Sequence, residues 1–227
     1  IDYFNDGKLS NAINLPISDQ SVMKKMLPFY NLTEKMGSIA SQLTSSAIKS
    51  IKITCYGEAE DSKSISLIFI KGLLSNIIDN RVNMINANVI ANERGINYSH
   101  SYKNESIAYS NLINCIIETS DNDIIQLSGS LFSQNHMRIV NVMGFDTDLD
   151  PSGSMLFVKN KDVPGVVGKI GTLLGNLNIN ISSYLLSKKT DNDYAFAIIK
   201  LDKKIEENIL IELQKIDELL EIKQVSL

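Results

Sequence analysis

The sequence is poor in the residue types that mark several specialised classes of protein. Its 227 residues include no tryptophan and only two cysteines, Cys55 and Cys115, which lie in strand-like sequence without Cys-x-x-Cys spacing. This excludes a disulfide framework, and we expect both thiols to be reduced and buried. No apolar run approaches the roughly 20 residues that a membrane span needs, and the sequence does not open on a secretory signal pattern. We therefore expect a cytoplasmic protein without membrane contact.

A strong excess of charge of one sign is also absent. The net charge is -4, the isoelectric point is about 5.3, and charged residues make up 21% of the chain. A nucleic-acid-binding surface needs an excess of basic residues, so nucleic acid is not an expected partner. Hydrophobic residues reach 44%, which is ordinary for a globular protein with a substantial core. The length corresponds to one or two domains.

Catalytic and cofactor-binding patterns are missing as well. The two histidines, His100 and His136, have no nearby nucleophile and no metal-ligand spacing, and exposed strand-end or loop positions explain both. Gly165, Gly168 and Gly171 have the spacing G-x-x-G-x-x-G, which differs from the G-x-G-x-x-G of dinucleotide-binding folds. Within these residues we expect no catalytic group, no metal and no cofactor.

The most informative segment spans 155–187 and reads MLFVKNKDVPGVVGKIGTLLGNLNINISSYLLS. An apolar strand ends in a polar turn, and Pro164, whose φ suits a first helical position, introduces a helix predicted over 166–177. Glycines form a stripe on this helix, and glycine lets another chain or a ligand approach the backbone closely. Asparagines then end the helix before a second strand.

The pattern continues to the C-terminus. A strand is predicted at 194–201, a helix at 205–216 and a last strand at 220–225. The order βαββαβ is the split ferredoxin-like motif, in which the helices cover one face of an antiparallel sheet. With its Asp-x-Pro-Gly turn and glycine-rich helix, the segment resembles an ACT domain, an amino-acid-sensing module of metabolic enzymes. The resemblance implies an ACT domain at 151–227.

Residues 16–150 are expected to form a separate domain of mixed structure, which places the chain in the α+β class. Helices are predicted at 22–43, 64–79 and 82–97, the first with a kink before Pro28. Strands are predicted at 48–56, 96–102, 110–119, 124–131 and 137–142. A polar linker at 146–153 leads to the last domain. Residues 1–15 look like the end of a helix and its exit, too short to fold alone.

This order of parts resembles the C-terminal region of the long form of D-3-phosphoglycerate dehydrogenase. The likeness covers essentially the whole chain and rests on LSNAIN near its start, ANVIANERGI and LSGSLF in the mixed domain, and DVPGVVGKIGTLLGNLNINIS in the ACT segment. In that family the mixed domain is an intervening, allosteric substrate-binding domain. The resemblance implies that residues 1–15 are a remnant of the catalytic core, and that NAD and the catalytic groups belong to the remainder of the enzyme.

The resemblance also implies a site for L-serine between two ACT domains. Asp162 matches a ligand residue in the turn before the Pro-Gly pair, and Asn180 matches one at the start of the partner's second strand. Asn160 lies where relatives often carry His or Tyr. A carboxylate accepts hydrogen bonds from a ligand ammonium, and an amide serves both ammonium and carboxylate. On the residues alone, Asp162 is also explained as a turn former and Asn180 as a helix-stop residue.

A second effector site is expected to be weakened. In some relatives the intervening domain binds a phosphate-bearing or acidic effector through basic residues near the linker, and Arg138 matches one of those positions, with His136 close by. Carboxylates repel a phosphate, and the matching stretch contains Phe145, Asp146, Asp148 and Asp150. A solvated surface arginine is the simpler explanation of Arg138.

The predicted function is therefore regulatory. The resemblance implies that the chain senses L-serine for an NAD-dependent 3-phosphoglycerate dehydrogenase, the first enzyme of serine synthesis, as a homodimer or homotetramer. Pairing of ACT domains would cover an exposed sheet edge. The alternative is a purely structural oligomerisation module without effector binding. Part of an iron–sulfur serine dehydratase is disfavoured, because two scattered cysteines cannot hold a cluster. Glycine is an alternative ligand.

Overall fold

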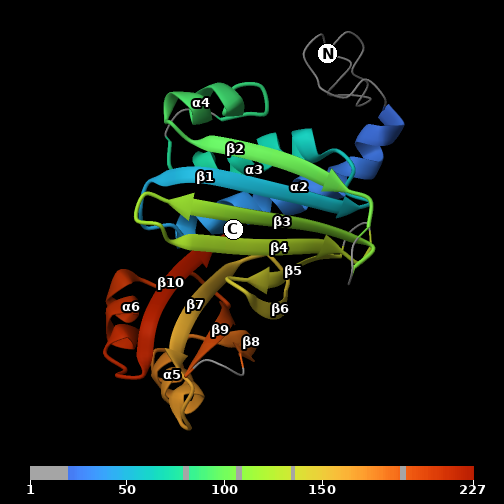
Figure 1. The fold of residues 1–227 in the computed structure, drawn as a ribbon. Helices are drawn as coiled ribbons and strands as arrows, with labels where there is room; N and C mark the ends of the chain where they lie inside the picture. Colours follow the sequence, from blue (N-terminus) through green and yellow to red (C-terminus); the bar gives the residue numbers. More distant parts are fainter. Residues whose placement is uncertain (1–19, 79–81, 106–108, 134–135, 190–192) are drawn as a thin grey trace, which may run out of the picture.

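The computed structural model describes residues 20–227 except 79–81, 106–108, 134–135 and 190–192 (Figure 1). The predicted remnant at 1–15 lies outside the described residues. Two sheets with helices packed on them form the described part, which confirms the predicted α+β class. No described helix is long and apolar enough to cross a membrane.

The first domain is built on a mixed sheet with the strand order β2-β1-β3-β4-β5-β6. Only β1 and β2 run parallel, and the other neighbours are antiparallel. The long helices α2 and α3 pack against each other on one face of this sheet (Figure 1). Its elements are α2 (Gln20–Leu43), β1 (Ile48–Gly57), α3 (Ser62–Ser75), α4 (Ala87–Glu93), β2 (Asn97–Lys103), β3 (Asn111–Thr119), β4 (Ile124–Leu131), β5 (Met137–Val142) and β6 (Phe145–Leu149).

The core of this domain follows the alternation of its strands. Along β3 the odd-numbered positions from Asn111 to Thr119 are buried while the residues between them are partly exposed, as the period of a half-buried strand requires. Both Cys55 and Cys115 are free and buried in this core, as predicted. Pro28 lies inside α2, which continues through it as one helix.

Two local predictions for this domain are wrong. The helix predicted at 82–97 is only α4, because asparagine side chains compete for the backbone before it. Asn83 Oδ1 accepts hydrogen bonds from the N–H groups of Ile85 and Asn86, at 2.9 and 3.0 Å. The linker predicted at 146–153 begins instead with β6, which pairs with β5. Its two acidic residues are exposed and only its end residues, Phe145 and Leu149, are buried, so composition hid the strand.

The second domain has the predicted βαββαβ order and an antiparallel sheet ordered β10-β7-β9-β8. Its elements are β7 (Ser154–Lys161), α5 (Val166–Asn176), β8 (Ile181–Lys188), β9 (Tyr194–Leu201), α6 (Glu207–Gln214) and β10 (Leu219–Ser226). Leu156 and Val158 of β7 pack with α5 in one hydrophobic cluster, whereas Met155 and Phe157 on the opposite face belong to the core of the first domain. The sheet is therefore buried on both faces.

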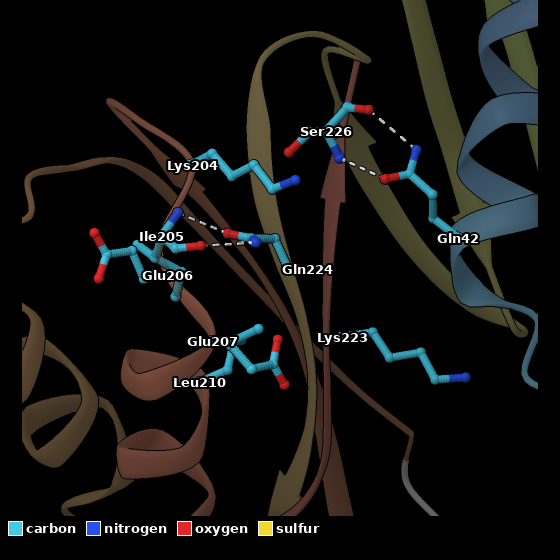
Figure 2. Close-up of a pocket in the computed structure, with 9 residues that line it drawn as sticks. All are labelled: Gln42, Lys204, Ile205, Glu206, Glu207, Leu210, Lys223, Gln224 and Ser226. Atoms are coloured by element: carbon cyan, nitrogen blue, oxygen red, sulfur yellow. Dashed lines mark hydrogen bonds between the residues drawn. The ribbon is translucent and has the colours of Figure 1, made fainter. Parts of the chain in front are cut away.

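The two domains are joined by backbone and aromatic contacts. Figure 2 shows the side-chain amide of Gln42, at the end of α2, bonded to both backbone groups of Ser226 in β10, where Nε2 donates to the carbonyl at 3.0 Å and Oε1 accepts from the N–H at 2.9 Å. Within the second domain, Gln224 makes the same double contact with the backbone of Ile205. Farther along the interface, the rings of Phe145 and Phe196 stack with their centroids 5.3 Å apart.

Candidate functional site

The turn between β7 and α5 presents unused backbone donors. Gly165 is the N-cap residue of α5 and has a φ of 95°, a left-handed conformation that glycine adopts without steric cost. The helix begins at Val166, the first residue of the range predicted for it. No side chain of the described residues caps this end of α5. The N–H groups of its first turn can therefore bind an anion such as a ligand carboxylate.

Asn160 offers a buried hydrogen-bond acceptor next to this turn. Asn160 is 4% exposed, and its Nδ2 donates to the carbonyl of Lys161 at 2.8 Å. Its Oδ1 is buried and has no hydrogen-bond partner among the described residues. Leaving a buried acceptor unpaired costs about 1–3 kcal/mol. A ligand that donates a hydrogen bond to this oxygen would remove that cost.

Glu218 is a second acceptor that sequence reasoning missed. Its backbone carbonyl accepts from the N–H of Lys161 at 2.8 Å, which places it across the sheet beside Asn160. Lys169 donates to Oε1 at 2.5 Å and thereby lowers the pKa of Glu218, while Oε2 is buried without a partner in the described part. Nothing in the local sequence indicates this role, because it depends on the pairing of β10 with β7.

Asp162 lies at the surface of the turn and is already in an ion pair. Its N–H donates to the carbonyl of Asp193 at 3.1 Å, and Lys188 Nζ lies 3.2 Å from Oδ2. The side chains are 37% and 70% exposed, and an ion pair as exposed as this contributes at most about 1 kcal/mol. A ligand ammonium can therefore compete with Lys188 for the carboxylate.

Asn180 lies at the opposite end of the domain. It follows α5 and precedes β8, its side chain is exposed, and its backbone N–H and carbonyl bond Asp202, at 3.3 and 3.2 Å. Asp162 bonds Asp193 at one end of β9, and Asp202 follows the other end. A strand of this length spans about 24 Å. One chain therefore does not bring Asp162 and Asn180 together around one small ligand.

The glycine stripe of α5 faces open space. A Cβ atom added at Gly168, Gly171 or Gly175 would meet no atom of another described element within 4 Å. Beside it, Val163 and Val167 are 46% and 47% exposed. The close approach that the glycines allow is therefore not made by any described part of the same chain.

The predicted anion position is surrounded by acidic groups. Arg138 Nε lies 2.9 Å from Asp148 Oδ1, and Nη1 lies 4.0 Å from Asp150 Oδ1. Lys200 Nζ, from the second domain, lies 2.7 Å from Asp150 Oδ2. His136 is exposed and its ring centroid lies 6.1 Å from that of Phe132. The carboxylates of Asp148 and Asp150 thus already pair with the positive side chains, Arg138 and Lys200, that an anionic effector would need.

The protonation of Asp150 reflects this environment. Partial burial alone would raise the pKa of its carboxyl group, but hydrogen bonds from Lys200 and Ser152 and the charges of Lys200 and Arg138 outweigh burial. The net result is a pKa below the ordinary value for aspartate. Asp150 is therefore ionised at neutral pH and joins the two domains through Lys200.

Known proteins match both domains. Residues 25–143 match the D-3-phosphoglycerate dehydrogenase intervening domain, and residues 154–218 match the ACT domain. The chain is 32% identical over 222 residues to D-3-phosphoglycerate dehydrogenase of Archaeoglobus fulgidus, covering 96% of this chain and 42% of that protein. Identity to the Bacillus subtilis protein of the same name is 27% over 219 residues, which again are 96% of this chain and 42% of that protein.

A third relative, D-3-phosphoglycerate dehydrogenase of Synechocystis, is 32% identical over 209 residues, which are 91% of this chain and 38% of that protein. The chain thus spans about two fifths of the length of these curated relatives. The match to the intervening domain alone covers more than half of the chain. The chain therefore belongs to the D-3-phosphoglycerate dehydrogenase family and corresponds to its intervening domain followed by its ACT domain.

Proposed function

We propose that this chain is the L-serine-sensing part of an NAD-dependent D-3-phosphoglycerate dehydrogenase of the cytoplasm. The catalytic groups and the NAD site belong to the remainder of such an enzyme, which oxidises 3-phosphoglycerate in the first step of serine synthesis. ACT domains typically bind amino acids and mediate oligomerisation, and the chain carries one. The observation that carries the proposal is the buried, unpaired Oδ1 of Asn160 beside the uncapped start of α5.

The groups around the start of α5 fit the chemistry of a small amino acid. The Asn160 oxygen and the carboxylate of Asp162 accept hydrogen bonds from an ammonium group, and Glu218 adds a further acceptor. The free N–H groups of α5 favour a carboxylate through hydrogen bonds and the helix dipole. A ligand with ammonium and carboxylate on one carbon places these charges close together, so the acceptors and the N–H groups at the start of α5 can bind both.

The separation of Asp162 and Asn180 supports a site shared by two chains. If two α5 helices pack antiparallel about a two-fold axis through their glycine stripes, the start of each helix meets the end of the other. Asp162 of one chain then lies near Asn180 of its partner, and the exposed valines are covered. Strand β8, at the edge of the sheet, is available for pairing next to them.

Regulation requires that serine prefer one of two arrangements of the assembly, because affinity alone shifts no equilibrium. We propose that binding fixes the geometry of the ACT pair, and that the intervening domain transmits this geometry to the catalytic domains. The continuous core between the two domains gives this route a physical basis.

Isothermal titration of L-serine into the chain tests the proposal. We expect heat of binding for the native chain, and a loss of affinity of at least about tenfold in Asp162→Ala and in Asn180→Ala, since each removes a hydrogen bond to a charged ligand group. Asp123→Ala, in an exposed hairpin turn of the first domain, is the matched control and should bind as the native chain does. Glycine serves as the competing ligand.

One result would support the alternative, a purely structural oligomerisation module. The ion pair of Asp162 with Lys188 is the observation that favours it, because an occupied carboxylate needs no ligand. If the chain forms oligomers that neither respond to serine nor change in Asn180→Ala, and titration gives no heat, sensing is excluded for this chain.

A further inference from the structure

A second cavity, separate from the ACT turn, lies where the two domains meet. It has a volume of about 190 Å³ and lies on the face of the smaller sheet that is turned away from α5 and α6. The first domain contributes Leu43, Met143 and Phe145 to its wall. The second domain contributes the rest, which are Phe157, Lys159, Tyr194, Phe196, Glu221 and Lys223.

Most of this wall is apolar and aromatic. Leu43, Phe145, Phe157 and Phe196 are between 1% and 6% exposed. The rings of Phe157 and Phe196 have centroids 6.2 Å apart, and Phe145 lies 5.8 Å from Tyr194. An apolar cavity of about 150 Å³ is large enough to bind benzene in an engineered protein, so a single ring with a short substituent fits here.

The two lysines of the wall have different surroundings. Lys223 donates to the carbonyl of Leu43 and, at 2.7 Å, to Ser45 Oγ, and its Nζ lies 3.3 Å from Glu221 Oε1. Lys159 has no carboxylate within ion-pair distance among the described residues. Its Nζ lies 4.2 Å from the centre of the Tyr194 ring. Glu221 is the cross-strand neighbour of Lys159 in β10 but pairs with Lys223, so Lys159 keeps a positive charge outside any ion pair of the described residues, at the edge of an aromatic cavity.

Met143 adds a further unusual feature to the same wall. Its φ is 51°, in the left-handed region that a bulky residue seldom adopts, and it forms the turn between β5 and β6 with Gly144. Its N–H donates to the carbonyl of Gln126 at 2.7 Å, which holds the turn against β4. The favoured two-residue hairpin loop needs a positive φ at both of its residues, so this turn fixes where the Met143 side chain enters the wall.

We infer that this cavity is a binding site for a small aromatic monocarboxylate, with its ring among Phe145, Phe157 and Phe196 and its carboxylate on Lys159. Such a ligand contacts both domains at once, so its binding favours the arrangement in which they are packed together. The site shares no residue with the proposed serine site, and its occupancy does not require serine.

Phenylacetate is the probe that tests this inference on the full chain. Methionine-methyl NMR should show a saturable shift of the Met143 methyl signal, with a dissociation constant of about 1 mM or below. The neutral isostere 2-phenylethanol should bind about tenfold more weakly, because it lacks the charge that Lys159 pairs with. L-Serine should leave this signal unchanged, which separates the result from the proposed function.

Variants decide between this cavity and surface binding elsewhere. Lys159→Gln should weaken phenylacetate about tenfold and bring its affinity to that of 2-phenylethanol, whereas Lys52→Gln, an exposed lysine of β1, should have no effect. Leu43→Phe fills the apolar part of the cavity and should abolish binding of both probes. Two results would overturn the inference. One is that the Met143 methyl signal does not shift at a phenylacetate concentration of about 10 mM, ten times the expected dissociation constant. The other is that Lys159→Gln and Lys52→Gln bind phenylacetate with equal affinity.

Discussion

Asp150 shows how one side chain can join two domains. Lys200, on β9, donates to its carboxylate and also to the Asp150 carbonyl, at 3.2 Å, while Arg138 approaches the same carboxylate from β5. The lysine is mostly buried, since its side chain is 18% exposed, whereas Asp150 is 48% exposed. Solvent therefore screens part of the attraction, and its net contribution stays modest.

We predict a pH-dependent effect of Asp150→Asn on stability. Because the pKa of Asp150 is lower in the folded chain than in the unfolded chain, its contribution is complete above the unfolded pKa of about 3.9 and is lost as pH falls through the folded value. Urea unfolding should show a loss of about 0.5–1 kcal/mol at pH 7 and no difference from the native chain at the lowest pH where it folds. Asp123→Asn should change neither value, and equal stabilities at pH 7 would contradict the prediction.

At the scale of elements, the crossing of α2 and α3 depends on two glycines. A Cβ atom at Gly37 would lie 2.3 Å from the carbonyl oxygen of Phe69, and one at Gly72 would lie 2.2 Å from that of Glu34. In both cases the obstacle is backbone, which cannot rotate away. The two helices therefore pack at a distance that only glycine permits, and this contact fixes how they cover the larger sheet.

Gly37→Ala should accordingly destabilise the chain by about 1–3 kcal/mol, because the helices must separate. Gly168→Ala is the comparison within one chain, since its added Cβ meets no other described element of that chain and alanine favours a helix by about 1 kcal/mol over glycine. Thermal unfolding of both variants measures the difference. Sedimentation of Gly168→Ala would in addition report whether the glycine stripe is part of an interface between chains, because a methyl group there would weaken it. Equal unfolding temperatures of the two variants would contradict the prediction, because α2 and α3 would then accept a methyl group between them without loss of stability.

At the scale of the whole molecule, the two domains share one hydrophobic core. Met155, Phe157, Phe196, Ile198 and Val225 of the smaller sheet belong to the same cluster as the buried side chains of α2, α3 and the larger sheet. A second cluster lies between the smaller sheet and its own helices. The ACT sheet is thus a middle layer, and its stability depends on both neighbours.

We predict that the described domains unfold together. Ile198 is 1% exposed on the face toward the first domain, so Ile198→Ala should cost about 2–4 kcal/mol. Methionine-methyl NMR during denaturation can follow Met36 in α2 and Met155 in β7 separately. Both signals should shift to the same lower midpoint in the variant. A lower midpoint for Met155 with an unchanged midpoint for Met36 would show that the domains unfold independently.

Local pattern predicted most of the elements and little of the geometry between them. The strands β4, β5 and β9 have the bounds that alternation and turn residues predicted, because those signals are local. The failures were also local: Asn83 shortened α4 by bonding the backbone, and acidic residues concealed β6. Asn160, Asp162 and Asn180 were predicted as site residues from their positions in a familiar motif. Glu218 and Lys188 were missed, because their proximity to the turn depends on strand pairing.

The sequence by itself determined that this chain has an α+β fold ending in a βαββαβ domain, because hydrophobic period, glycine and proline act over a few residues. The tertiary structure alone decided that Asp162 and Asn180 lie at opposite ends of one domain, that Asn160 keeps an unpaired buried oxygen, and that a cavity lies between the domains. These features depend on contacts between segments far apart in the chain, and such contacts are set by packing rather than by any local signal.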